Sequence, residues 1–300
     1  MKIGFSSYCF AEKMLSGQMS VPEVFDWVGT SGADHMELAV VGLTNQSSEL
    51  EWNLDDDPDL VDTIAAAAAK SGVELSGMCI PASFLDSDTG DVRGQIERAK
   101  HHVELADKLG VRFFRHDVTK WGHKDEGIAD VETSFPALVD ASKEVAQHAA
   151  KYGITTSVEN HGFFVNASER VRRLVYAVDE PNFKTTIDVG NFLCVDEDPL
   201  IAVTRNLPFA SFVHFKDFYV RPHHLAPGDG WLETSGGNYI LGSIFGFGDM
   251  DTRGIAKAVV ESGYDGYISL EFEGLEDGFL GATRGLANIR SVVAAAQAAA

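Results

Sequence analysis

The chain has 300 residues and a formal net charge of −21, with 45 Asp and Glu against 24 Lys and Arg. A nucleic-acid binder usually presents a basic face to phosphates, so this charge disfavours a nucleic-acid partner. No apolar run reaches the roughly 18 residues of a membrane span, and the first ten residues resemble a strand more than a signal peptide. Cys9, Cys79 and Cys194 form no paired motif, so we expect a cytoplasmic protein without disulfides.

Short β-rich runs alternate with longer helical runs along the chain. In the first helix, Ser20 is the expected N-cap, Glu23 completes a capping box, and Pro22 falls in the first turn. Helices are predicted from about 21, over about 58–70, 90–109, 130–151 and 167–178, from about 199, over 251–262 and at the C-terminus. Strands are predicted at 2–7, 34–38, 73–79, 111–117, 154–160, 183–190, 210–217 and 267–274.

Eight strand–helix units predict an α/β protein with a single (β/α)8 TIM barrel, which needs about 250 residues. We therefore expect one domain over 1–300. An open doubly wound sheet is disfavoured, because no GxGxxG follows any predicted strand.

One segment breaks this rhythm. Residues 218–248 hold Pro222, Pro227 and many glycines, and they show no helical pattern. A loop this long in a compact domain is usually functional or disordered. Because it follows the seventh strand at the face where barrel active sites lie, we expect it to cover the substrate.

Polar residues end four consecutive predicted strands. They are Glu159, Asp188, His214 and Glu271, each in an otherwise apolar or small-residue strand. Carboxylates and an imidazole facing one axis would repel and desolvate one another unless a cation joined them. The pattern therefore predicts a divalent metal site, with Mn²⁺ as first expectation and Mg²⁺, Co²⁺ or Zn²⁺ as alternatives.

Several motifs in this order resemble the sugar phosphate isomerase/epimerase family of xylose isomerase-like TIM barrels. The resemblance covers almost the whole chain. Its strongest pieces are SVENHG at 157–162, TIDVGN at 186–191, VHFKD at 213–217, and FGFGDMD with ESGYDGYISLEFEG within 245–274. Some ketose epimerases of the family have a histidine at the position of Asn191.

The resemblance implies chemistry on a small sugar-like keto substrate. A bound metal would polarise the carbonyl, and glutamates would remove and return a proton beside it. By analogy with the ketose 3-epimerases, Glu159 and Glu271 would be both metal ligands and the acid/base pair, while Asp188 and His214 would be ligands only. A homo-oligomer is compatible with the family, but no residue pattern decides it.

Other strand ends supply candidates for substrate binding. His161 follows Glu159 by two residues and would point the same way in a continuing strand. Lys216 and Glu37 end the seventh and second strands, His116 ends the fourth, and Arg221 lies just past the seventh. Trp121 and Phe164 are weaker candidates for packing against a sugar.

Three alternatives stay open. A metal-dependent dehydratase or lyase, acting on an inosose or a 3-oxo-glycoside, would use the same proton abstraction, with His116 or His161 as the acid. An apurinic-site endonuclease shares the fold, but the net charge of −21 disfavours it. A non-catalytic barrel subunit is disfavoured by the intact set of four ligands.

Overall fold

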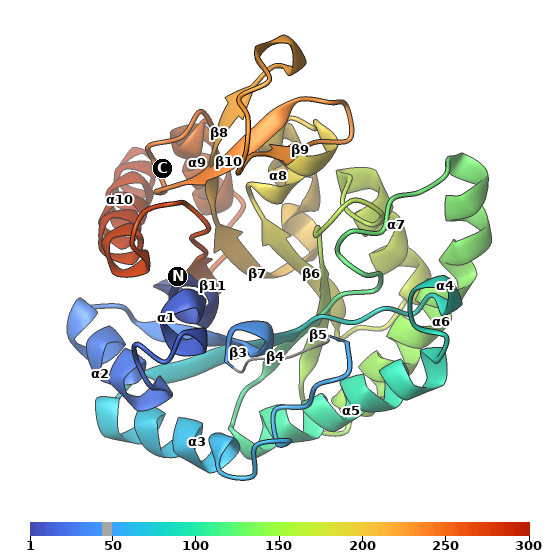
Figure 1. Cartoon of the computed structure of the whole chain (residues 1–300), viewed down its shortest axis with the longest axis horizontal. Helices are drawn as coiled ribbons and strands as arrows, with labels where there is room; N and C mark the ends of the chain where they lie inside the picture. The colour runs from blue at the N-terminus through green and yellow to red at the C-terminus, as the bar shows by residue number, and fades with distance from the viewer. Residues whose placement is uncertain (44–49) are drawn as a thin grey trace.

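The computed structural model describes residues 1–43 and 50–300. Its centre is a closed barrel of parallel strands in the order β1-β11-β7-β6-β5-β4-β3-β2, closed by pairing of β1 with β2. The predicted TIM barrel is therefore confirmed, and Figure 1 shows the helices arranged around the strands. The barrel strands are β1 Lys2–Ser6, β2 His35–Ala39, β3 Glu74–Ile80, β4 Phe113–His116, β5 Thr155–Glu159, β6 Phe183–Asp188, β7 Ala210–Phe215 and β11 Tyr267–Leu270.

The helices follow the strands as their sequence signals predict. The Glu23 side chain accepts a hydrogen bond from the Ser20 backbone N–H at 2.8 Å and so closes the predicted capping box. Gly32 ends the same helix with a positive φ of 84°. The α-helices are α1 Ala11–Leu15, α2 Val21–Ser31, α3 Leu60–Ser71, α4 Asp86–Thr89, α5 Val92–Lys108, α6 Ile128–Ala150, α7 Ser168–Val178, α8 Pro199–Asn206, α9 Thr252–Glu261 and α10 Gly278–Ala299.

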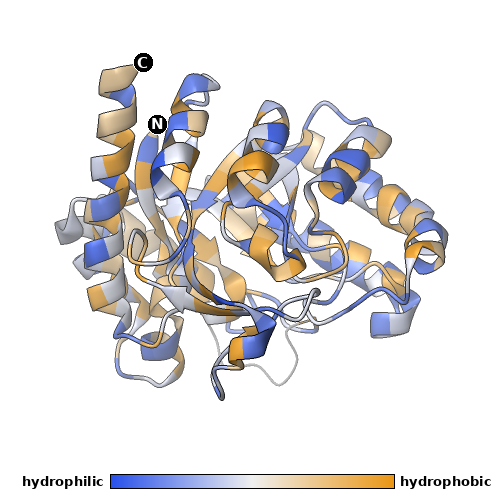
Figure 2. Ribbon diagram, turned by 90° about the horizontal axis from the view of Figure 1, so that it is seen from above, coloured by the Kyte–Doolittle hydropathy of each residue, from blue (hydrophilic) through white to orange (hydrophobic). Residues whose placement is uncertain are grey.

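Short 3₁₀ helices occur in several connections between these elements. They are η1 Ser7–Phe10, η2 Val40–Gly42, η3 Asn191–Val195, η4 Leu207–Phe209 and η5 His223–Leu225. Figure 2 shows bands of hydrophilic and hydrophobic residues along the helices, and both chain ends at one end of the barrel. Within the described ranges, no helix has the length and apolar character needed to cross a membrane.

The segment predicted as a loop over 218–248 contains a small antiparallel sheet. Its strands are β8 Asp217–Arg221, β9 Leu232–Glu233 and β10 Tyr239–Ser243, in the order β8-β10-β9. The sheet is drawn at the top of Figure 1, and its Phe218 and Ile240 pack with Phe163 and Cys194. None of its described residues lines the main cavity, so the prediction that this segment covers the substrate gains no support from its position.

Aromatic side chains form the floor of the barrel interior below the strand ends. Phe212 stacks on Tyr267 with ring centroids 5.7 Å apart, and Phe113 meets both rings edge-on. His214 follows Phe212 by two residues on the same face of β7, and the two rings lie 5.7 Å apart. The polar side chains at the strand ends therefore rest on a packed apolar layer.

Candidate metal centre and cavity

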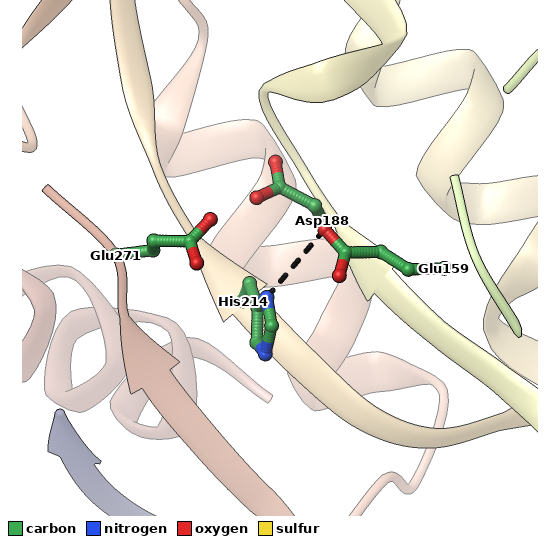
Figure 3. Close-up of side chains that lie close together, drawn as sticks. All are labelled: Glu159, Asp188, His214 and Glu271. Atoms are coloured by element: carbon green, nitrogen blue, oxygen red, sulfur yellow. Dashed lines mark ion pairs between the residues drawn. The ribbon is translucent and has the colours of Figure 1, made fainter. Parts of the chain in front are cut away.

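Glu159, Asp188, His214 and Glu271 converge at the carboxyl ends of neighbouring strands. Each offers a ligand atom, and these atoms all lie within 4.8 Å of one another. Glu159 and Asp188 end β5 and β6, His214 lies in β7, and Glu271 directly follows β11. Figure 3 shows the four side chains pointing toward a common region.

The two ring nitrogens of His214 have different neighbours. Nε2 lies 2.8 Å from a carboxylate oxygen of Glu37, and Nδ1 lies 3.7 Å from Glu159 Oε1. Burial alone would lower the pKa of His214, but the negative charges of Glu37 and Glu159 outweigh it and hold the pKa well above its ordinary value. The Glu37 carboxylate is thus paired by charge with one ring nitrogen, and the other nitrogen lies toward Glu159.

The cluster contains buried atoms that a cation would satisfy. Asp188 Oδ2 and His214 Nδ1 are buried and have no hydrogen-bond partner among the described residues. Burial, reinforced by the charges of Glu271 and Glu159 and opposed by Lys216, raises the pKa of Asp188 to about 7. Carboxylate oxygens with one imidazole are a donor set that divalent cations accept. The residues therefore fit a divalent metal ion.

Lys216 supplies a positive charge beside the cluster. Its Nζ lies 2.6 Å from Glu271 and 3.4 Å from Asp188, and it donates a hydrogen bond to Asn191 Oδ1 at 3.3 Å. Asn191 in turn donates to Glu159 Oε1 at 3.0 Å. Lys216 is 2% exposed and is not among the residues that line the cavity. The sequence left open whether Lys216 binds substrate oxygens or balances a carboxylate, and in the structure it contacts the carboxylates of the cluster.

A cavity of about 740 Å³ opens above the cluster. Glu159, Glu271 and His161 line it, together with Trp121 and Tyr8. Its volume is within the usual range for small-molecule sites. Both glutamates of the predicted acid/base pair thus reach the space where a substrate would lie.

Both glutamates favour the ionised form. Burial would raise the pKa of Glu159, but the charges of Arg115 and His214 outweigh it and hold the pKa below its ordinary value. Burial acts in the same sense on Glu271, and Lys216 with His214 lowers its pKa. Carboxylates in this state accept protons.

His161 lines the cavity, and its ring pairs with the Asp117 carboxylate. Its Nδ1 lies 3.1 Å from Asp117 Oδ1. Burial would lower the pKa of His161, but the charge of Asp117 outweighs it and raises the pKa. The imidazole therefore has a defined orientation beside Glu159.

Other predicted substrate contacts lie elsewhere. His116 is on the outer face of β4, buried against the rings of Phe84 and Phe183, and it does not line the cavity. Burial lowers the pKa of His116 to about 4. Arg221 lies 3.3 Å from Asp249 on the outer sheet, with its guanidinium 5.4 Å from the Trp231 ring centroid.

Glu37 and Phe164, two further candidates for substrate contact, contact other side chains of the protein and do not line the cavity. Glu37 is 1% exposed and contacts His214. Phe164 is fully buried and packs edge-on against His123 with ring centroids 4.9 Å apart. Of the two aromatic candidates, Trp121 alone lines the cavity.

Sequence reasoning missed Arg115 and Asp117, which both line the cavity. Arg115 Nε lies 2.6 Å from Glu159 Oε2, and its Nη2 lies 2.8 Å from Asp117 Oδ1. The available signal was strand alternation: Arg115 pairs with Ser157, which shares an inward face with Glu159. His116, the next residue, must then face outward.

Comparison with known proteins agrees with this architecture. The family described as Xylose isomerase-like TIM barrel matches residues 25–292. An inosose dehydratase of Lacticaseibacillus casei is 25% identical over 167 residues, which is 52% of this chain and 56% of that protein. The chain thus matches only about half the length of this curated relative.

Solved structures share the fold at low sequence identity. A xylose isomerase-like TIM barrel protein from Mycobacterium smegmatis in complex with magnesium has a TM-score of 0.73 and 16% identity, covering 98% of this chain and 97% of that one. The 3-keto-D-glucoside 4-epimerase from E. coli has a TM-score of 0.71 and 16% identity, covering 97% and 99%. With a family match over nine-tenths of its length, the chain belongs to the xylose isomerase-like TIM barrel family.

Proposed function

We propose that the protein is a divalent-metal-dependent isomerase or epimerase that removes and returns a proton beside the carbonyl of a small sugar-like keto substrate. The observation that carries this proposal is the placement of Glu159 and Glu271, which belong to the four-residue ligand cluster and also line the cavity. A structural ion pair would need no such access to a substrate-sized space.

Glu159, Asp188, Glu271 and His214 Nδ1 would hold the cation. When bound, a divalent ion supplies Lewis acidity that favours loss of a proton beside a carbonyl. The oxygen-rich donor set makes Mn²⁺ our first choice, with Mg²⁺, Co²⁺ and Zn²⁺ as alternatives.

The two glutamates approach from different strands of the barrel. Glu159 ends β5 and Glu271 follows β11, and β6 and β7 lie between these strands in the barrel order. A substrate held between them would meet one carboxylate on each side. One glutamate can remove a proton from one face, and the other can return it on the opposite face, which is the requirement for epimerisation.

Dehydration is the second candidate, and two observations favour it. Curated relatives that match part of the chain are inosose dehydratases. His161, held by Asp117, also lines the cavity beside Glu159, where it can protonate a departing hydroxyl. Both candidates begin with the same proton abstraction.

Deuterium exchange tests the shared step. The Mn²⁺-loaded protein would be incubated in D₂O with keto-sugars, inososes and 3-oxo-glycosides, and the ¹H-NMR signal beside each carbonyl followed. We expect exchange with at least one class, its loss in excess EDTA, and its restoration by Mn²⁺ or Co²⁺.

A matched pair of variants tests whether Glu271 is required for exchange. Glu271→Gln should keep the fold but lose exchange, whereas Glu261→Gln on the exposed side of α9 should keep it. Full exchange in excess EDTA would refute the metal requirement, and unchanged exchange in Glu271→Gln would remove Glu271 as a base.

A further inference from the structure

Among the described residues, three Lys and Arg side chains and His161 line the cavity, and all of them except Lys120 pair with carboxylates. Arg115 is bound by Glu159 and Asp117. Lys13 lies 2.8 Å from Asp277. Lys120 is exposed. Among the residues that the structure describes, no buried Lys or Arg of the cavity lining is left to receive a new anion.

Carboxylate side chains outnumber Lys and Arg side chains among the described residues that line the cavity. Besides the two metal-ligand glutamates, the acidic side chains that line the cavity are Glu12, Asp117, Glu273 and Glu276. Carboxylate oxygens accept hydrogen bonds from hydroxyl groups but repel a phosphate, which carries nearly two negative charges at neutral pH.

The backbone sites that usually bind phosphate in this fold are also filled. TIM barrels often hold phosphate at a helix N-terminus near the last two strands. Here Asp277 accepts hydrogen bonds from the N–H groups of Phe279 at 3.0 Å and Leu280 at 3.2 Å at the start of α10. Asp251 fills the start of α9 in the same way, accepting from Gly254 at 2.9 Å.

Apolar surface accompanies these carboxylates. Trp121, Tyr8 and Phe272 line the cavity. Trp121 is 39% exposed and packs edge-on against Phe163 with ring centroids 5.6 Å apart. Aromatic faces suit the C–H surface of a sugar ring, and the carboxylates suit its hydroxyl groups.

We infer that the substrate is an uncharged polyhydroxylated ketone, without a phosphate group, whose hydroxyls donate to the carboxylates of the cavity wall. This inference rests on the proposed function and narrows its substrate class. Among the described residues, a phosphate ester would meet six carboxylates and no unpaired buried Lys or Arg in the cavity lining, and Asp277 already occupies the N-terminus of α10.

Matched pairs of substrates test the inference. D-fructose and D-ribulose would be compared with D-fructose 6-phosphate and D-ribulose 5-phosphate, alongside a neutral inosose and a 3-oxo-glucoside, by deuterium exchange with the Mn²⁺-loaded protein. We expect exchange within the neutral set and at least tenfold slower exchange of each ester than of its parent. An ester that exchanges faster than its parent would overturn the inference and leave the proposed function standing. Absence of exchange from every compound would overturn the proposed function, and the inference with it.

Removal of one helix cap provides a second test. Asp277→Ala frees the N-terminus of α10 and Lys13, so the ratio of ester to parent exchange should rise roughly two- to fivefold, as expected for one charge at a helix end. Asp251→Ala removes the matched cap of α9, whose residues do not line the cavity, and should leave the ratio unchanged. Equal ratios in both variants would contradict the role assigned to Asp277.

Discussion

The carboxylate of Glu37 lies 2.8 Å from Nε2 of His214, while Nδ1 of the same ring faces Glu159. Both side chains are buried. A carboxylate behind a metal-binding imidazole fixes the orientation of the ring and raises its basicity. Glu37 therefore supports the proposed metal site through His214, although its place at the end of a strand had made it a candidate to hold a sugar hydroxyl or Lys216.

Glu37→Gln tests this support. The amide keeps the shape of the side chain but removes the charge that orients and polarises His214. We expect Mn²⁺ affinity to fall about 10- to 100-fold, measured by titration of free Mn²⁺ with electron paramagnetic resonance.

Glu74→Gln is the control. Glu74 is the first residue of barrel strand β3 and pairs with Lys2 and Tyr267, outside the cluster. Its replacement should therefore leave Mn²⁺ affinity as in the wild type. Equal affinities of Glu37→Gln and the wild type would remove Glu37 from the metal site.

The sequence predicted the barrel and the four converging residues because both depend on local signals. A polar residue at the end of an apolar strand is visible without knowledge of its neighbours, and consecutive parallel strands bring such ends together. The sequence did not show which of Arg115 and His116 faces inward, because a one-residue change of strand phase exchanges the two faces.

The sheet β8-β10-β9 was missed for a different reason. Its main ladder joins Asp217–Arg221 to Tyr239–Ser243 across a connection that holds Pro222, Pro227 and several glycines. Pairing at this separation depends on tertiary contacts, such as the packing of Phe218 and Ile240 with Phe163 and Cys194. Composition alone indicates a loop.

The outward position of His116 leads to a prediction. His116→Phe keeps an aromatic ring among Phe84, Phe114 and Phe183 and loses the contact of Nδ1 with the Asp117 carbonyl at 2.9 Å. The free energy of unfolding should fall by about 1 kcal/mol, and deuterium exchange into the substrate should continue.

His161→Phe provides the comparison, because the same substitution there removes an imidazole that lines the cavity. His161→Phe should strongly lower the rate of deuterium exchange or, if the protein is a dehydratase, the rate of elimination. Exchange lost in a stably folded His116→Phe protein, as followed by chemical denaturation, would show that His116 takes part in the chemistry after all.

The charges in the cluster make metal binding depend on pH. Metal ligands bind in their deprotonated forms, whereas burial and neighbouring carboxylates raise the pKa of Asp188 to about 7. Glu37 and Glu159, against the effect of burial, also hold the pKa of His214 above its ordinary value. Below about pH 7 the cation must therefore displace protons from both residues.

Mn²⁺ affinity should accordingly rise as the pH increases from 6 to 8, and binding should release protons. Calorimetric titrations in buffers with different ionisation enthalpies measure that release. An affinity that stays constant across this range, with no buffer-dependent heat, would contradict deprotonation of Asp188 and His214 on binding.

Arg115 positions Glu159 by bridging it to Asp117. The guanidinium reaches both carboxylates at once, at 2.6 and 2.8 Å, which the single ammonium of a lysine cannot reproduce. Arg115→Lys should keep the charge but let Glu159 shift, and a misplacement of about 1 Å can reduce turnover about 100-fold. We expect kcat for exchange to fall far more than KM changes. The Arg115 guanidinium already pairs with two carboxylates and so is not available to bind the substrate.

Arg173→Lys is the control. Arg173 forms an exposed pair with Glu132, so this variant should behave as the wild type. If the two variants have equal kcat, the bridge does not position Glu159 for proton transfer.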